Sequence, residues 1–439
     1  MAAKQPRWPA PESRSRAIFE RARRVLPGGI SRLLTWVDPF PVYARRGQGA
    51  YIEDEDGTRR LDFMNNFASL IHGHAHPAVV EAAQAAVGDG TCFALPGERE
   101  VALAEVLCAR ITRVEKVRFC NSGTEAVMLA LKAARARSGR PRIAKVEGAY
   151  HGMYDYAEVS LDPTPEGWGN APQAVAYAHG TPRSVLDDTV VLPFNQPEEA
   201  ERILRATGDT LAAVLIDPVP ATAGMVPGTF EYLQTVQRVA REIGARVIVD
   251  EVIALRLAYR GAQSRFFLEP DLTVLGKIIG GGFPVGAVGG TDEAMAVFSH
   301  ERGKPLNPSS GTFTGNPVTM AAGLATMGLL TAEAYDQLEA LGEHARAVVR
   351  AALAGAGVAW QVTGVGSMLQ LHPHDREIVD YRSAFPAPAE AAALRRVHRA
   401  LLERGFILSP RCAAFLSTAN TFDQLERFAE ALGEVLAAL

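Results

Sequence analysis

Helices that alternate with short apolar strands constrain the fold of this chain most strongly. From about Leu61 onward, apolar runs of strand length recur, separated by segments of helix length. The predicted strands are Val117–Cys120, Ile143–Val146, Ala213–Ile216, Val247–Asp250, Thr273–Leu275 and Val285–Val288. The predicted helices are Pro77–Val87, Thr124–Ser138, Glu198–Arg205 and Phe230–Ile243. This order is typical of an α/β domain with a mainly parallel sheet, which binds its ligand at the carboxyl ends of the strands.

The two ends of the chain predict a second, smaller domain. Near the start, a basic amphipathic helix at Ser13–Leu26 precedes β-like stretches at Pro41–Ala44 and Ala50–Ile52, with a hairpin turn at Asp54–Gly57. From about Thr331 the predicted helices are Ala332–Ala354, Ala389–Arg404 and Phe422–Leu439, around strands near Gln361–Thr363 and Met368–Leu371. Because 439 residues exceed one compact core, we expect a large domain over 61–330 and a small α+β domain built from 1–60 and 331–439.

Two segments allow more than one interpretation. The basic helix at Ser13–Leu26 is expected to pack on the body or on a partner subunit, although a transit peptide or a membrane-surface helix has the same pattern. The stretch Asp155–Thr189 is rich in Pro, Gly and polar residues and is too long for an ordinary connection. We interpret it as an active-site lid, with a surface excursion as the alternative.

Composition excludes several classes of protein. A net charge of −4 and a pI near 6.2 give no footprint for nucleic acid, and no apolar stretch reaches membrane-spanning length. The four cysteines form no C-x-x-C pair, which fits reduced thiols in a cytoplasmic enzyme. G-x-S-x-G, G-x-G-x-x-G after a strand and G-x-x-x-x-G-K-[ST] are all missing from the sequence, which removes three common enzyme classes.

A lysine and an aspartate follow two of the predicted strands. The chain has six lysines, and Lys277 comes after the apolar run Thr273–Leu275 and before three glycines. A lysine there is costly unless it is paired, neutralised or used covalently. Asp250 ends the strand before it, so both side chains can meet at one sheet edge. Pyridoxal phosphate requires this combination, a Schiff-base amine and a carboxylate partner for its pyridinium nitrogen.

Two further motifs follow predicted strands. Asn121-Ser122-Gly123-Thr124-Glu125 opens a helix, and it is either a capping box or a phosphate cup made by free N–H groups at the helix start. Together with Asp250 and Lys277, the phosphate cup is the better explanation. Tyr150-His151-Gly152 follows another strand, where an aromatic ring could stack on a flat cofactor or serve only for packing.

Three alternating histidines compete with this interpretation. His72, His74 and His76 would face one way on a strand and could bind a metal in a hydrolase. Pro77 begins a helix directly afterwards, and no further ligand set follows, so we expect no metal site.

Five motifs occur together in a fixed order. They are Asn121–Ala126, Tyr150–Gly152, Asp250–Val252, Leu275–Gly282 and Gly311–Pro317. In this order they resemble the class III pyridoxal-phosphate aminotransferases, particularly the branch of glutamate-1-semialdehyde aminomutases and β-amino-acid (β-phenylalanine type) transaminases. The family's Gly-His-x-His-Pro also appears at Gly73–Pro77, which weakens the metal interpretation. The resemblance runs from about Gly28 to the end of the chain and implies the fold type I aminotransferase architecture.

The resemblance implies a role for each matching residue. Lys277 would be the Schiff-base lysine and Asp250 the partner of the pyridine nitrogen. The remaining cofactor contacts that it implies are Ser122, Gly123, Thr124, Tyr150, His151 and Val252, with Thr312 reaching the phosphate from a neighbouring subunit. A homodimer with shared active sites follows from that last contact.

Departures from the family pattern bear on the substrate. Asp217 stands where the family usually has Glu, and Ala254-Leu255-Arg256 replaces the common Thr-Gly-Phe. Arg411 in Ser409-Pro410-Arg411, and Arg32 before Pro39-Phe40-Pro41, resemble the β-amino-acid transaminases. A guanidinium fork suits a carboxylate, so Arg32 and Arg411 are expected substrate contacts. Phe67 is the third expected substrate contact.

We therefore expect a homodimeric cytoplasmic transaminase that passes the amino group of a β-amino acid or related amine to 2-oxoglutarate or pyruvate. The alternatives are a glutamate-1-semialdehyde aminomutase, a metal-dependent hydrolase using His72, His74 and His76, and a catalytically silent regulator that binds the cofactor. The last is disfavoured because Lys277 and Asp250 are both present.

Overall fold

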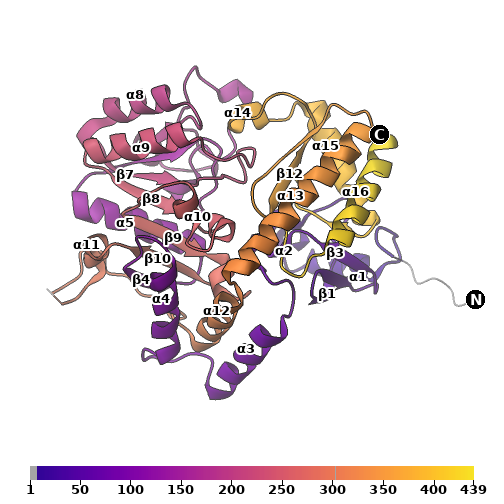
Figure 1. Ribbon diagram of the computed structural model, residues 1–439, viewed down its shortest axis with the longest axis horizontal. Helices are drawn as coiled ribbons and strands as arrows, with labels where there is room; N and C mark the ends of the chain where they lie inside the picture. The colour runs from indigo at the N-terminus through magenta and orange to yellow at the C-terminus, as the bar shows by residue number, and fades with distance from the viewer. Residues whose placement is uncertain (1–6, 302) are drawn as a thin grey trace, which may run out of the picture. The chain divides into compact units, whose positions relative to one another are not determined.

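The computed structural model describes residues 7–301 and 303–439 (Figure 1). The chain forms two compact units. The large unit comprises Ala78–Tyr335 and Glu377–Phe385, and the small unit comprises Met1–Pro77, Asp336–Arg376 and Pro386–Leu439. Residues 1–6 of the expected segment 1–60 lie outside the described residues.

A seven-stranded sheet forms the centre of the large unit, in the order β4-β10-β9-β8-β7-β5-β6. The strands are β4 (Lys116–Cys120), β5 (Arg142–Val146), β6 (Thr189–Leu192), β7 (Leu211–Ile216), β8 (Arg246–Asp250), β9 (Leu272–Gly276) and β10 (Gly286–Gly290). β10 runs antiparallel to β4 and β9, whereas the pairs from β9 to β6 are parallel. The predicted α/β class with a mainly parallel sheet is confirmed.

Helices cover both faces of this sheet. Leu215 and Ile248 pack with α5 on one face, whereas Val214 and Val247 pack with α8 and α9 on the other. The main helices are α3 (Pro77–Asp89), α4 (Glu98–Arg110), α5 (Gly123–Ser138), α8 (Pro197–Thr207), α9 (Phe230–Glu242) and α12 (Pro317–Leu329). Short ones are α6 (Asp155–Glu158), α7 (Arg183–Asp187), α10 (Ala262–Arg265), α11 (Asp292–Met295) and α14 (Tyr381–Ala384). Burial on both faces explains why these strands are continuously apolar.

The small unit contains two sheets. One has the order β1-β2-β3-β13 and the other β11-β12-β14. Their strands are β1 (Ala44–Gln48), β2 (Tyr51–Asp54), β3 (Arg59–Asp62), β11 (Gln361–Thr363), β12 (Met368–His372), β13 (Phe406–Ile407) and β14 (Ala413–Phe415). The helices are α1 (Arg14–Ala22), α2 (Asn65–Ala68), α13 (Ala332–Gly355), α15 (Pro388–Glu403) and α16 (Phe422–Ala437).

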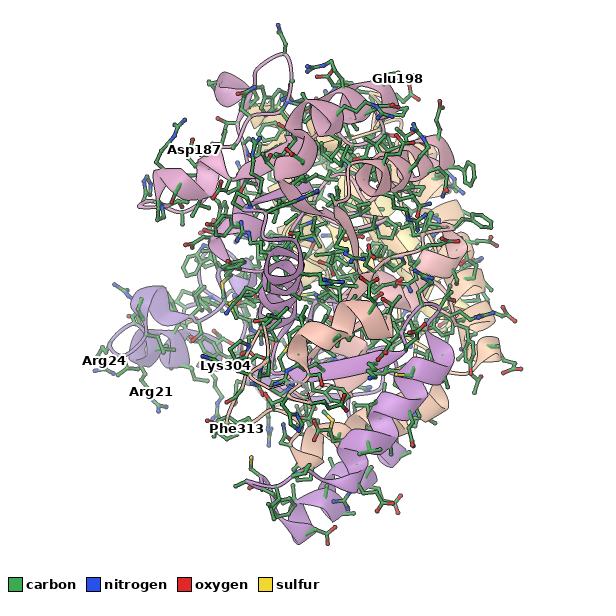
Figure 2. The ribbon with its side chains drawn as sticks, turned by 90° about the vertical axis from the view of Figure 1, so that its left-hand side faces the viewer. Arg21, Arg24, Asp187, Glu198, Lys304 and Phe313 are labelled. Atoms are coloured by element: carbon green, nitrogen blue, oxygen red, sulfur yellow. The ribbon has the colours of Figure 1, made fainter. Side chains whose placement is uncertain are left out.

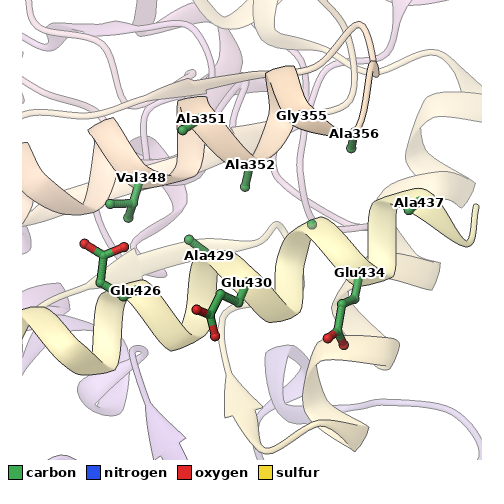
Figure 3. Close-up of a pocket in the computed structure, with 11 residues that line it drawn as sticks. Val348, Ala351, Ala352, Gly355, Ala356, Glu426, Ala429, Glu430, Glu434 and Ala437 are labelled. Carbon is green, nitrogen blue, oxygen red and sulfur yellow. The ribbon is translucent and has the colours of Figure 1, made fainter.

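Aromatic rings fill the core of the small unit. Phe63 stacks on Phe406, with ring centroids 6.4 Å apart, and meets Phe428 edge-on at 5.2 Å. A groove between α13 and α16 is lined mostly by small residues, and in Figure 3 Glu426 of α16 points toward Val348 of α13.

Several predicted elements differ from the structure. The strand predicted at Pro41–Ala44 begins only at Ala44, and its partner is reached through a turn at Gly49. The first helix is capped by the Ser13 hydroxyl but ends at Ala22, before Pro27 and two glycines with positive φ. β6, α4 and α12 were not predicted. No helix in the described ranges is both long and apolar enough to cross a membrane.

Candidate active site

Three ionisable residues follow three neighbouring strands of the large sheet. Asp217 comes directly after β7, Asp250 ends β8, and Lys277 comes directly after β9. Because these strands are parallel and adjacent, their carboxyl ends meet at one edge. Asp250 and Asp217 both act to raise the pKa of the Lys277 amine, as expected for three side chains at this edge, here called the Lys277 cluster.

Lys277 has the properties of a nucleophilic lysine. Burial lowers the pKa of its amine, while Asp250 and Asp217 oppose that change. A lowered pKa increases the neutral fraction, which can attack a carbonyl or accept a proton. The backbone of Lys277 has a φ of +50°, which is unfavourable for a residue with a Cβ. Residues with such strained backbone conformations are concentrated at functional sites.

The other lysines do not offer a comparable amine. Lys116, Lys132 and Lys304 are exposed. Lys145 is fully buried in β5 and donates a hydrogen bond to the Val159 carbonyl at 2.7 Å. Among the described residues, Lys277 is therefore the lysine best placed to meet a ligand.

Asp250 is held by two donors. Nδ1 of His151 lies 2.7 Å from Oδ2 of Asp250, and the Val252 N–H donates to Oδ1 at 2.9 Å. Burial lowers the pKa of His151, although Asp250 acts in the opposite direction. A neutral His151 therefore carries its proton on Nδ1, facing the carboxylate. Its buried Nε2 has no hydrogen-bond partner in the described part of the chain.

Asp217 and Glu251 are two further buried carboxyl groups. Burial and the nearby Asp250 carboxylate raise the pKa of Asp217 well above its usual value, and its Oδ1 accepts the Val219 N–H at 2.9 Å. Burial also raises the pKa of Glu251 to about 7, and its oxygens accept the N–H groups that open α10. Glu251 therefore serves the fold, whereas Asp217 belongs to the Lys277 cluster.

The start of α5 forms a small cradle. The Ser122 hydroxyl accepts the Glu125 N–H at 3.1 Å and caps the helix, while the Gly123 and Thr124 N–H groups have no partner within the helix. Val252 lies against this turn, since a Cβ on Gly123 would come within 3.2 Å of it. The Thr124 hydroxyl accepts the Met153 N–H at 3.3 Å, which ties the Tyr150–Gly152 loop to the same turn.

The loop carrying Tyr150 and His151 comes close to Thr124 at Gly152. A Cβ on Gly152 would lie 2.5 Å from the Thr124 hydroxyl, and Gly152 has a φ of +89°. Both features require glycine here. Tyr150 remains 45% exposed, whereas His151 is 2% exposed, so the two neighbours divide into an accessible ring and an internal one.

Thr312 lies in an exposed loop of the large unit. Its carbonyl accepts a hydrogen bond from the Cys92 thiol, with a distance of 3.4 Å between sulfur and oxygen. The cavity beside it is lined by Phe93–Glu100 and by Ser310, Gly311, Thr312, Thr314, Gly315 and Pro317.

The expected substrate residues belong to the small unit. Arg32 donates to Oδ1 of Asn66 at 2.7 Å, and its guanidinium lies 5.8 Å from the Phe67 ring centroid. Arg411 is exposed in the turn before β14.

Phe67 sits in a left-handed turn that the sequence did not reveal. Four consecutive residues, Asn65 to Ala68, have φ values from +47° to +72°. The Asp62 carboxylate accepts the Met64 and Asn65 N–H groups, and the Asn65 side chain donates to the Phe415 carbonyl at 2.7 Å. These bonds offset a backbone cost of about 1–2 kcal/mol per residue.

The three histidines do not share a ligand position. His74 pairs with Asp62 at 2.7 Å, and His72 lies 2.9 Å from the Thr418 hydroxyl. Within residues 7–301 and 303–439, no three or more His, Cys, Asp or Glu side chains group as metal ligands would.

Two residues near Lys277 were not among the predicted site residues. Asp217 and Arg256 were noted only as departures, yet both interact electrostatically with the Lys277 amine. Arg256 is 1% exposed, and burial lowers its pKa to about 9. A charged residue directly after an apolar strand was the available signal for Asp217.

The fold and the Lys277 cluster together define a pyridoxal-phosphate aminotransferase of fold type I. The family profile described as "Aminotransferase class-III" matches residues 34–422, and the chain belongs to this family.

Relatives cover nearly the whole chain. An ω-transaminase from Sphaerobacter thermophilus has 50% sequence identity and a TM-score of 0.94, covering 97% of this chain and 98% of that one. A β-phenylalanine aminotransferase from Variovorax paradoxus has 33% identity and a TM-score of 0.87, covering 97% and 94%. A glutamate-1-semialdehyde 2,1-aminomutase from Methanothermobacter thermautotrophicus is 39% identical over 97% of this chain and 99% of its own.

The family uses pyridoxal 5′-phosphate, and a 44% identical transaminase has been solved with it bound. The residues present fit this group. A lysine with a lowered pKa suits its aldehyde, and a buried carboxylate held by two donors suits its ring nitrogen. The N–H groups at the start of α5 that have no partner within the helix suit its phosphate.

Proposed function

We propose that this protein is an aminotransferase that moves the amino group of a β-amino acid or a related amine to an oxo-acid such as 2-oxoglutarate or pyruvate. The observation that carries the proposal is the 50% identity to an ω-transaminase over nearly the full length of both chains. The likeness to a β-phenylalanine aminotransferase at 33% identity supports the β-amino-acid class of donor.

Lys277 moves the protons in this reaction. Pyridoxal phosphate, when bound, supplies an aldehyde that receives the amino group and a ring that accepts the electron pair of the broken C–H bond. With the cofactor bound, the neutral Lys277 amine would take the proton from the carbon that bears the substrate nitrogen, and would later return it at the cofactor aldehyde carbon. Its lowered pKa favours the first of these steps, because a neutral amine is the base.

Asp250 keeps a proton on the pyridine nitrogen. His151 and the Val252 N–H hold the carboxylate in one orientation. A fixed anion facing a protonated ring favours the charged form of that ring. Burial and the Asp250 carboxylate raise the pKa of Asp217, which favours the protonated form of this neighbour and lessens its repulsion of Asp250.

The other cofactor contacts come from the α5 cradle and from the loop after β5. Ser122, Gly123 and Thr124 hold the phosphate through their N–H groups and hydroxyls. Tyr150 and Val252 take the two ring faces. The partial exposure of Tyr150 and the close packing of Val252 on Gly123 support these roles.

Substrate carboxylates are assigned to two arginines of the small unit. Arg32, steadied by Asn66 and Phe67, binds the donor carboxylate, and Arg411 binds the acceptor. The exposure of the Arg411 side chain supports a residue that serves one substrate and yields to the next.

We assign the protein to a cytoplasmic homodimer in which Thr312 contacts the phosphate of the partner subunit. The Thr312 region carries exposed apolar side chains, with Phe313 62% and Leu95 78% exposed. Figure 2 shows Phe313 and Lys304 on the same side of the large unit. Exposed apolar clusters of this kind mark protein interfaces, which supports a subunit partner here.

An aminomutase is the second candidate. It is favoured by the identity of 39% to a glutamate-1-semialdehyde 2,1-aminomutase over 97% of the chain. Such an enzyme moves an amino group within one molecule and requires no separate acceptor, whereas a transaminase without an oxo-acid stops after its first half-reaction.

A donor screen with and without an oxo-acid separates the two candidates. The purified holoenzyme should convert β-amino acids only when 2-oxoglutarate or pyruvate is present, with one product for each acceptor consumed. Efficient isomerisation of glutamate-1-semialdehyde without an acceptor, together with no turnover of β-amino acids, replaces the proposal by the aminomutase.

A further inference from the structure

The loop that carries Tyr150 and His151 is bounded by an ion pair outside the Lys277 cluster. Arg382 of α14 donates from Nε to Oε2 of Glu147 at 2.7 Å and from Nη2 to Oε1 at 3.0 Å. Glu147 is 5% exposed and directly follows β5. A paired, buried fork of this kind fixes geometry as well as charge.

The same arginine is fixed on its other side. Nη1 of Arg382 donates to the Gly169 carbonyl at 2.7 Å, and the guanidinium lies 5.2 Å from the Trp168 ring centroid. Trp168 in turn meets the Tyr381 ring edge-on, with centroids 6.4 Å apart. The guanidinium thus joins three segments of the large unit: the end of β5, the stretch after α6, and α14.

Tyr381 packs directly on the loop backbone. A Cβ on Gly148 would lie 2.1 Å from Cδ2 of Tyr381, and Gly148 has a φ of +74°. The Gly148 N–H donates to the Ser160 carbonyl at 2.8 Å, and its own carbonyl accepts the Thr222 hydroxyl at 2.6 Å. The ring therefore occupies the space that any other residue at position 148 would need.

α14 itself is rigidly placed in the large unit. The Asp380 carboxylate accepts the Ser383 N–H at 2.8 Å in a capping box, and its other oxygen accepts the Gln196 side chain at 3.1 Å. The Asn195 side chain donates to the Val379 carbonyl at 2.9 Å. Hydrogen bonds thus fix the segment Glu377–Phe385 to the rest of the large unit, although the chain on both sides of it belongs to the small unit.

We infer that Tyr381 and Arg382 are positioning residues that set the loop from Glu147 to Gly152, and through it the His151–Asp250 hydrogen bond and the Tyr150 ring. This inference rests on the proposed function, because the loop matters through the cofactor contacts assigned to it. Arg382 contacts Glu147 and Tyr381 packs on Gly148, so their effect passes through the loop backbone. The ordinary alternative is that the ion pair only stabilises the fold.

The test compares Arg382→Lys with Arg376→Ala in the holoenzyme. Lysine keeps the charge but loses the fork. Arg376 is the matched control because it also forms a two-point pair, with Glu390 at 2.6 and 2.9 Å, in the small unit. Glu147→Gln is the second variant and approaches the same pair from the loop side. Each protein is compared by hydrogen–deuterium exchange of the peptide 147–153, by the dissociation constant of pyridoxal phosphate, and by melting temperature.

Arg382→Lys and Glu147→Gln should each raise loop exchange and the cofactor dissociation constant by about tenfold, which equals about 1.4 kcal/mol. Arg376→Ala should leave both unchanged, whatever its melting temperature. Loop exchange and cofactor affinity equal to wild type in both test variants overturn the inference. None of these readouts uses an amine or oxo-acid, so a failed donor screen refutes the proposed substrate class without touching this result.

Discussion

Replacing Asp250 by Asn isolates the charge that the proposed chemistry requires. The two side chains have nearly the same shape, so the fold of β8 should persist. In the native protein, the Asp250 carboxylate accepts hydrogen bonds from Nδ1 of His151 at 2.7 Å and from the Val252 N–H at 2.9 Å. An asparagine has one acceptor oxygen, so its NH₂ group must face one of these donors.

The expected loss follows from that geometry. A hydrogen bond to a charged group contributes about 1.5–3 kcal/mol, which corresponds to about a ten- to hundredfold change in rate. The neutral amide also removes the anion that holds the ring proton, so both losses act in the same direction. Asp250→Asn should therefore slow both half-reactions by about tenfold to a hundredfold.

The assay is single-turnover absorbance of the cofactor, first with an amine and then with an oxo-acid. Asp271→Asn is the matched control, because Asp271 also accepts one side chain and one backbone N–H, from Arg246 and Val247, both at 2.8 Å. It precedes β9, at the opposite end of that strand from Lys277. Near wild-type rates in Asp250→Asn, or an equal loss in the control, would refute the assignment of Asp250 as the ring partner.

Three further predictions test the substrate, the buried lysine and the interface. Arg411→Ala should mainly raise KM for 2-oxoglutarate and Arg32→Ala mainly KM for a β-amino acid, each by about tenfold or more; steady-state kinetics that match wild type for both contradict the assignment. Burial lowers the pKa of Lys145 from 10.5 to about 7, so between these values the unfolded chain binds one more proton and stability falls by about 1.4 kcal/mol per unit as the pH drops. Lys145→Met should flatten this slope, which is measured as the difference in the free energy of unfolding by denaturant between about pH 7.5 and 9.5. A variant whose free energy of unfolding differs from wild type by the same amount at both pH values would argue against this prediction. Phe313→Asp should produce monomers in sedimentation, whereas Phe267→Asp, at a side chain 67% exposed, should not; an unchanged dimer in the first variant, or a monomeric wild type, speaks against this interface.

The strand ends could be predicted because their chemistry is local. Lys277 and Asp250 each follow an apolar run, and parallel strands bring their carboxyl ends together. The bond between His151 and Asp250 could not be predicted, because it joins residues 99 positions apart across β5, β7 and β8. The sequence marks both residues but not their contact.

Other features left little trace in the sequence. The left-handed turn at Asn65–Ala68 contains Phe and Ala, which rarely adopt positive φ. It depends on hydrogen bonds that Asn65 donates to the Asp62 carboxylate and to the Phe415 carbonyl. The short strand β6 begins at Thr189, the last residue of the irregular stretch Asp155–Thr189, so the sequence does not mark it as a separate element. Trp168 and Arg382 are nearly half the chain apart in sequence, so no local pattern predicts their contact.

The central claim is that Lys277 is the residue bound to pyridoxal phosphate, and chemical trapping tests it most directly. Borohydride treatment of the yellow holoenzyme should remove the colour and leave the cofactor fixed to the protein, and peptide mapping should find it on Lys277. Lys145 is the informative competitor, because burial lowers the pKa of its amine as it does for Lys277. A label on Lys145 or on any exposed lysine, or a protein that contains metal and no pyridoxal, would contradict the account.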